Sequence, residues 1–250
     1  MKKVVSRFLM LSLFLLPFCL VGCGKESIRP INNDILNDVG LFSVSATQKV
    51  AFAPGNLAEG GRSFVASQYQ LGGYFGWGTG DHPGDTSINW QDYSVFHDWG
   101  DSIEGGWRTL SFDEWKYIVF EREQASEKYG VGMIESNTGL ILLPDDWNMP
   151  EDCQFNPGMY EYERNQYSLN QWQKMEESGA VFLPAGGYRM GSRIYVPDIW
   201  GMVHGNYWLS TRYDEDDAFY IYFIANPDNL LPIPITRLAA GMQVRLVRNK

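Results

Sequence analysis

Two segments of the chain combine a helix-capping box with apolar residues at helical spacing. In the first, Ser111 is followed three residues later by Glu114; in the second, Ser168 is followed by Gln171, and Gly179 supplies the stop. The apolar residues behind each box share one helical face, and they include Phe112, Trp115, Ile118, Val119 and Trp172. We therefore predict two helices, and we expect their tryptophans to anchor the core rather than to contact a ligand.

Short apolar runs, several with period two, predict strands between and around these helices. Two hairpins are expected, from residues 41–46 with 50–53 and from residues 131–134 with 140–143. Further strands are expected at 180–189, 205–211, 219–223 and 241–248. Residues 69–107 are rich in Gly, Trp and Tyr without a clear period, which is typical either of a functional loop or of a loop layer held on a sheet by its aromatic side chains.

The run from 212 to 240 has the composition of a binding surface. It combines four consecutive carboxylates with tyrosines that alternate with apolar residues. The alternation predicts that Phe219, Ile221 and Phe223 face the core, and that the opposite, tyrosine-bearing set faces outward, where tyrosine offers a large contact area at low entropic cost. A sheet edge whose tyrosines only cover the core is the alternative. The residues that we expect to bind a ligand are Asn206, Arg212, Tyr213, Asp214, Asp216, Asp217, Tyr220, Tyr222, Ile224, Asn226 and Asp228.

The first residues have the pattern of a lipoprotein signal peptide. Lys2, Lys3 and Arg7 form a charged region before the apolar stretch 8–20, which is too short to span a bilayer as a stable helix. Small residues precede Cys23, so we expect cleavage after residue 22 and lipidation of Cys23. Ordinary secretory cleavage, with Cys23 as a bystander, is the alternative. The expected organisation is a signal peptide at 1–22, a tether at 23–40 and one domain at 41–250.

The charge and the cysteine content argue against two classes of function. The chain contains 20 Lys and Arg against 30 Asp and Glu, a net charge of −10, which becomes −13 once the leader and its three cations are removed. A polyanion does not seek phosphate backbones, so no nucleic-acid partner is expected. With Cys23 capped by lipid, Cys153 is the remaining thiol of the mature chain, and one thiol builds neither a disulfide nor a multi-cysteine metal site.

We expect no cofactor and no metal. Asp145, Asp146 and Asn148 carry oxygen atoms that calcium prefers, but their spacing is not that of an EF-hand loop and a solvated turn explains them. Cys153 has no basic helix end or histidine beside it in the sequence, so a nucleophilic role is unsupported. Metal-ligand spacing is also missing among the three histidines, His82, His97 and His204.

Parts of the chain resemble a known family. Residues 107–115 are similar to the helix-opening motif of formylglycine-generating-enzyme (sulfatase-modifying-factor) domains, in which Arg-Leu-Pro-Thr leads to Glu-Trp, and 241–247 is similar to their closing Gly-Phe-Arg strand. Bacterial surface lipoproteins with a C-type-lectin-like fold, which include variable proteins of diversity-generating retroelements, are more similar still, over residues 42–248. The resemblance implies an α+β fold in which the first and last strands pair, two helices flank small antiparallel sheets, and long irregular loops build the binding face.

The departures from this family bear on function. Formylglycine-generating enzymes use an active-site cysteine pair and their iron-dependent relatives a histidine triad, and the chain matches neither, so we expect no oxidase activity. We expect a non-catalytic, lipid-anchored ligand-binding protein of the outer membrane that faces the cell exterior and binds a protein or a glycan. A structural component of an outer-membrane complex remains open. So does a glycan-associated enzyme that would use Asp214, Asp216 or Asp217 with Glu161 or Glu163.

Overall fold

The first and last strands that the structure describes lie in one sheet. The computed structural model describes residues 40–80, 93–196, 202–225 and 235–250, all within the unit Asn33–Lys250. The opening hairpin, β1 (Leu41–Ser43) and β2 (Lys49–Phe52), pairs through β2 with the closing strand β13 (Val247–Asn249), and β13 pairs with β3 (Trp107–Arg108). The predicted opening hairpin is confirmed, as is the mixed α+β class.

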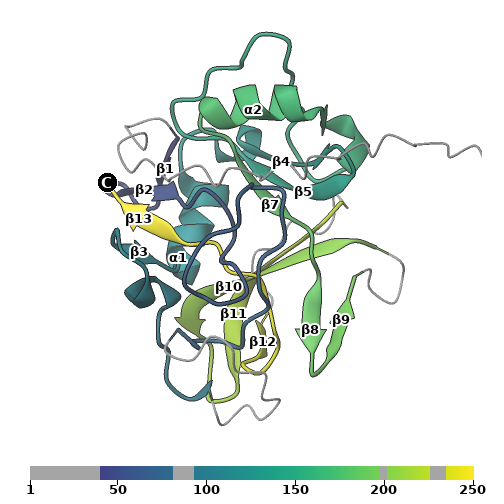
Figure 1. Cartoon of the computed structure of the whole chain (residues 1–250). Helices are drawn as coiled ribbons and strands as arrows, with labels where there is room; N and C mark the ends of the chain where they lie inside the picture. Colours follow the sequence, from purple (N-terminus) through teal and green to yellow (C-terminus); the bar gives the residue numbers. More distant parts are fainter. Residues whose placement is uncertain (1–39, 81–92, 197–201, 226–234) are drawn as a thin grey trace, which may run out of the picture. The chain divides into compact units, whose positions relative to one another are not determined.

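A second sheet is built around the predicted hairpin of residues 131–143, which is also confirmed. Its order is β6 (Gln166–Tyr167), β4 (Tyr129–Ile134), β5 (Asn137–Leu142) and β7 (Val181–Pro184). The turn between β4 and β5 is shorter than expected, because Glu135 adopts a positive φ of 52° and closes it at once. Helix α2 (Leu169–Glu177) lies over this sheet (Figure 1) and buries Trp172 and Met175 against it.

Both predicted capping boxes are present. Ser111 opens α1 (Phe112–Lys116), which continues directly into the π-helical turn η4 (Tyr117–Glu121), and Ser168 opens α2. Glu114 also forms an ion pair with Arg108, with 2.6 Å between Oε1 and Nη2, so the box is tied to β3. Trp115 and Trp172 are each 1% exposed, which confirms that both are buried.

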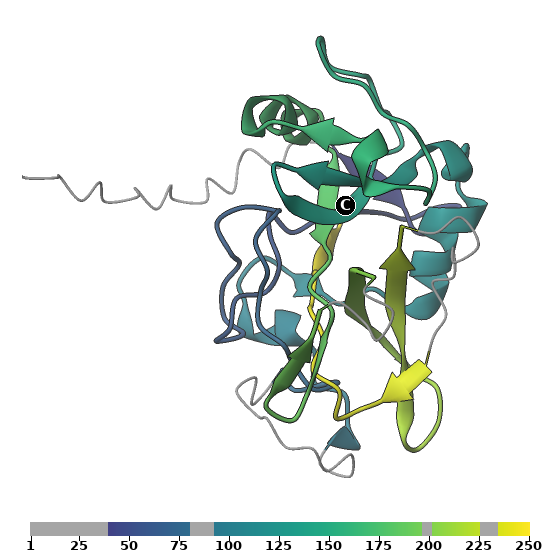
Figure 2. The same ribbon diagram turned by 90° about the vertical axis from the view of Figure 1, so that its right-hand side faces the viewer.

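The third sheet carries the segment that the sequence singled out. Its order is β10 (His204–Arg212), β11 (Asp217–Ile224) and β12 (Ile235–Arg237). The hairpin of β8 (Tyr188–Met190) and β9 (Arg193–Tyr195) lies beside this sheet (Figure 2), and a bridge between Gly187 and Gly205 joins the two. The strand expected at 180–189 is therefore two strands, β7 and β8, separated by Ala185, Gly186 and Gly187.

The loops upstream of α1 form the predicted aromatic layer. Five of their aromatic residues are buried in one cluster with Trp208 and Leu246, and these are Phe75, Trp77, Tyr93, Trp99 and Trp107. The interpretation of these aromatics as loop-packing residues is thus confirmed. Short 3-10 helices complete the connections that the structure describes: η3 (Trp99–Ser102), η5 (Ala125–Glu127) and η6 (Tyr162–Arg164).

The strand predicted at 241–248 is regular only at its end. Residues 241–243 form isolated bridges to three different segments, and the ladder begins at Val247. The reason is a buried polar network. Gln243 accepts a hydrogen bond from the backbone of Gly72 at 2.6 Å, and Arg245 donates to Asn56 at 2.9 Å, so this backbone follows its side-chain partners instead of one neighbouring strand.

The turn after β5 holds charge and is not freely solvated. Asp145 is half-buried and accepts hydrogen bonds from the backbone and hydroxyl of Ser43, while Lys49 and Arg122 lie 3.1 and 3.3 Å from its oxygens. Burial alone would raise the pKa of Asp145, but the bonds from Ser43 and the two cations outweigh it and lower the pKa. This part of the solvated-turn interpretation is wrong, because the carboxylate ties the opening hairpin to the second sheet.

Candidate ligand-binding face

The register of β10 and β11 separates two faces as the alternation predicted. Gly205 of β10 lies opposite Phe223 of β11, and Tyr207 of β10 lies opposite Ile221 of β11. Phe223 and Ile221 are both buried in the main core. The predicted core positions Ile221 and Phe223 are therefore confirmed. Phe219 is half-buried and stacks on Phe112, with ring centroids 4.4 Å apart.

The opposite face gathers aromatic rings from several strands. Tyr195 stacks on Tyr188 with centroids 5.2 Å apart, Tyr188 lies 5.8 Å from the ring of His204, and His204 lies 5.8 Å from Tyr222. Tyr220 continues the row toward Trp208, at 6.2 Å. We call Tyr188, Tyr195, His204, Tyr220 and Tyr222 the tyrosine face.

The phenol groups of this face lie close to one another and are partly desolvated. Burial raises the pKa of Tyr220, and the neighbouring Tyr222 and Tyr188 raise it further. Tyr162, which lies in the main core and not in this face, also has a pKa raised by burial, with a smaller contribution from Tyr222, and its hydroxyl donates to the Val203 carbonyl at 2.9 Å. At neutral pH these phenols are protonated hydrogen-bonding groups, so the face offers uncharged polar contacts beside aromatic surface.

Two of the expected ligand contacts are buried, and for them the prediction of exposure is wrong. Asn206 and Ile224 are each 1% exposed. The Asn206 amide nitrogen lies 2.6 Å from Nδ1 of His204, and its backbone carbonyl accepts from the backbone of Gln243 at 3.1 Å. Strand alternation assigns a residue to a face, but the hairpin β8–β9 and the aromatic loop layer pack on this one, so facing away from the main core does not mean facing water.

The acidic turn before β11 is organised by its own backbone. Asp214 Oδ1 accepts from the backbone nitrogens of Asp216 and Asp217, both at 2.9 Å. Arg212 donates to the carbonyls of Ser94, Asp214 and Glu215 and lies over the Trp77 ring, 5.8 Å from its centroid. Arg212 and the Asp214 carboxylate thus fix the shape of the turn, whereas Tyr213 at its start is 54% exposed.

The structure brings the predicted site residues together only in part. Tyr220 and Tyr222 lie in the tyrosine face, while Tyr213, Asp214 and Asp216 lie in the acidic turn at the other end of β11, with Asp217 as the first residue of that strand. Asn226 and Asp228 lie outside the described residues. The alternation within one strand identified the tyrosines of β11, but it missed Tyr188, Tyr195 and His204, which join them only through the packing of β8 on β10.

The catalytic alternatives find little geometric support in the described residues. In those parts of the chain, no group of three or more His, Cys, Asp or Glu residues could hold a metal ion. No hydrogen bond or ion pair there joins Asp214 or Asp216 to Glu161 or Glu163. Cys153 is half-buried, and burial raises its pKa, which disfavours the nucleophilic thiolate.

Comparisons with models of protein families, with curated proteins and with solved structures found no match to this chain. Within the described ranges, no helix combines the length and the apolar composition that crossing a membrane requires.

Proposed function

We propose that this chain is a non-catalytic ligand-binding protein, anchored to the outer membrane by a lipid on Cys23 and displayed to the cell exterior. The observation that carries the proposal is the tyrosine face, in which β11 and the hairpin β8–β9 bring four half-buried tyrosines together around the buried imidazole of His204, which is 2% exposed and supports the rings from beneath. Rigid aromatic side chains with polar tips are the groups that binding surfaces favour. The ligand is a protein or a glycan.

A C-type-lectin-like fold, of the variant found in sulfatase-modifying-factor domains, is part of this proposal. Three features support it: the opening hairpin pairs with the closing strand, two capped helices flank the small sheets, and a long irregular layer precedes α1. In such an arrangement the termini and sheets form the scaffold, and the segments around β8–β11 are left to present side chains. If the chain is similar in function to the variable proteins of diversity-generating retroelements, these are the segments that would carry its ligand contacts.

The tyrosine face can be tested while the ligand is still unidentified. The full-length protein in detergent is applied to a printed oligosaccharide array and to a phage library of random peptides, and each binder is then measured against Tyr195→Ala and Tyr222→Ala. We expect at least one binder whose affinity falls by about fivefold or more in either variant, since a central aromatic contact contributes about 1 kcal/mol or more. The unfolding midpoint in urea should shift little for Tyr195→Ala, because that residue lies on the outer hairpin.

Two outcomes would contradict the tyrosine face. One is that neither panel yields a specific binder. The other is that binders are found whose affinity is unchanged in both tyrosine variants. Tyr160→Ala serves as the matched control, because Tyr160 is a 49% exposed tyrosine that belongs neither to the tyrosine face nor to the expected ligand contacts.

The lipid anchor gives a second prediction. Cys23→Ser should abolish acylation, so the protein should leave the detergent phase or remain unprocessed at its higher mass. Cys19→Ser, which changes a cysteine inside the leader, is the control and should be processed and partitioned as the wild type. Phase partition with intact-mass measurement reads both results, and unchanged partition of Cys23→Ser would rule out the anchor.

A further inference from the structure

Among the residues that the structure describes, no strand pairs with the outer edge of β9. Within the described ranges, β9 pairs only with β8. On the other side of β8, Arg189 donates its backbone N–H to the Gly241 carbonyl at 2.7 Å and accepts from the Gly241 N–H at 2.8 Å. Since both backbone groups of a strand residue point the same way, Arg189 and Ile194 form a non-hydrogen-bonded pair. The N–H and C=O of Ile194 therefore point to the open edge.

An apolar strip runs beside this edge. Ile194 and Val196 are 50% and 38% exposed, and their spacing of two places them on the same face of the strand. A Cβ on Gly187 would lie 2.4 Å from Val196 Cγ2, and one on Gly186 would lie 2.4 Å from Leu71 Cδ2. Leu71 is itself 46% exposed, so Leu71 and Val196 cover two consecutive buried glycines and extend the apolar strip from Ile194 to Leu71.

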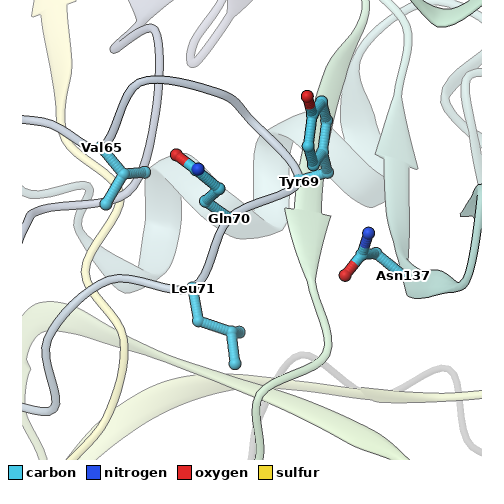
Figure 3. A pocket seen from close by; sticks show the side chains of 5 residues that line it. All are labelled: Val65, Tyr69, Gln70, Leu71 and Asn137. Atoms are coloured by element: carbon cyan, nitrogen blue, oxygen red, sulfur yellow. The ribbon is translucent and has the colours of Figure 1, made fainter. Parts of the chain in front are cut away.

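The strip leads into an open hollow. The hollow has a volume of about 590 Å³ and lies between the loop 65–71 and the β4–β5 turn (Figure 3). Its wall consists of Val65, Tyr69, Gln70, Leu71 and Asn137, so it presents aliphatic and aromatic surface with two carboxamides and no charged group. Leu71 belongs to both the strip and the hollow, and a hollow of this lining suits an apolar side chain better than a charged one.

The loop that forms the hollow is firmly held. Gln68, between Val65 and Tyr69, is 5% exposed and accepts from the backbone of Phe182 at 2.6 Å. Its amide also donates to Glu176 and to the Ala180 carbonyl. A preformed wall lowers the ordering cost of binding.

The charge of the hairpin differs from that of the chain. Residues 187–196 contain Arg189 and Arg193 and no carboxylate, in a chain of net charge −10. Among the described residues neither arginine forms an ion pair. Arg193 alternates with Ile194, so the cation and the apolar strip lie on opposite faces of the same strand.

We propose that the open edge of β9 binds an extended segment of a partner protein by strand addition. The segment pairs with the backbone of Ile194 and alternates apolar residues, which cover the strip and enter the hollow, with acidic residues, which face Arg193. The apolar strip lies on the other side of the hairpin from Tyr188 and Tyr195, whereas Arg193 lies on their side, over the Tyr195 ring at 4.8 Å from its centroid. The partner segment therefore runs along the edge of the hairpin, and its backbone and apolar contacts are distinct from those of the ligand proposed for the tyrosine face.

A defined peptide tests the proposal. A fluorescein-labelled peptide in which valine and glutamate alternate is titrated with the full-length protein in detergent, and fluorescence anisotropy reports binding. We expect Ile194→Pro to weaken binding by about tenfold or more, because proline removes the outward N–H while leaving those of Arg193 and Tyr195 that bond to β8. Ile194→Thr keeps the N–H and the β-branched shape, and should lose less affinity than the proline variant. Arg193→Glu should also weaken binding.

A second measurement shows where the peptide binds. Addition of the peptide should slow amide hydrogen exchange at Ile194, and a peptide in which valine and lysine alternate should neither bind nor slow it. The proposal is overturned if the valine–glutamate peptide does not bind the wild type, or if Ile194→Pro and Ile194→Thr bind alike. It is also overturned if the edge pairs with a second copy, which a concentration-dependent dimer lost in Ile194→Pro would show.

Discussion

Arg245→Met is expected to lower the free energy of unfolding by about 3 to 5 kcal/mol, because it removes a fully desolvated cation and leaves its partners buried. Arg245 is 4% exposed and donates to Asn56 Oδ1 and to the carbonyls of Ala53, Gln68 and Phe182. Burial lowers its pKa to about 10, which still leaves the guanidinium charged at pH 7. Urea unfolding followed by tryptophan fluorescence measures the loss.

The control for this prediction is Arg248→Met. Arg248 is half-buried and lies over the Trp107 ring, 5.3 Å from its centroid, so its removal should cost about 1 kcal/mol or less. Arg245→Lys keeps the charge but cannot reach four separate acceptors, and it should be nearly as destabilising as methionine. Equal stabilities for Arg245→Met and Arg248→Met would show that the buried network does not hold the loops.

Trp172→Ala is expected to cost about 3 to 5 kcal/mol of unfolding free energy, through lost burial and the cavity left behind. The ring is 1% exposed and meets Tyr167 and Phe182 edge-on, with centroids 5.9 and 5.5 Å away. It joins α2 to the second sheet, so its loss should loosen that helix first. Denaturant unfolding monitored by circular dichroism measures the effect, and a stability equal to the wild type would contradict the assignment of this residue to the core.

A matched pair of phenylalanine variants separates volume from hydrogen bonding. Trp172 Nε1 is buried without a hydrogen-bond partner, whereas Trp208 Nε1 donates to the Phe75 carbonyl at 2.7 Å. Trp172→Phe should therefore cost about 1 kcal/mol less than Trp208→Phe, since only the second removes a buried hydrogen bond, although the Phe75 carbonyl keeps the one from the Met242 N–H at 3.0 Å. The reverse order would mean that ring packing, not the indole N–H, distinguishes the two sites.

The elements that could be predicted from the sequence are those whose cause is local. A capping box needs residues three apart, and Ser111 with Glu114 and Ser168 with Gln171 specified both helix starts. The two strands of a hairpin are also close in sequence, so the pattern predicts the β1–β2 and β4–β5 hairpins and errs only at their turns and ends. The hydrogen bond from Arg245 to Asn56 instead spans 189 residues, and nothing near either residue indicates it.

For the candidate site, too, the sequence predicts local features but not the contacts between distant segments. The alternation of residues along β11 predicts that Ile221 and Phe223 face the core, and both do. The same alternation says nothing about what packs on the other face, where Ile224 of β11 and Asn206 of the neighbouring β10 are buried and not exposed to solvent. His204 was weighed only as a metal ligand, because its role as the ring between Tyr188 and Tyr222 depends on a strand pairing that sequence spacing does not reveal.

The way in which the acidic turn is held decides which of its positions can vary. Arg212 binds the carbonyl oxygens of Asp214 and Glu215, and carbonyl oxygens are common to every amino acid. The Asp214 carboxylate supplies the remaining contacts to the backbone of the turn. The side chains of Tyr213 and Glu215 are exposed and take no part in these backbone contacts, and the Tyr213 ring only meets Phe219 edge-on, with centroids 5.4 Å apart. Glu215 can therefore change from one lineage to the next while the loop keeps its shape, and Tyr213 can change to any residue that still covers Phe219, so the turn can evolve new surface chemistry without refolding.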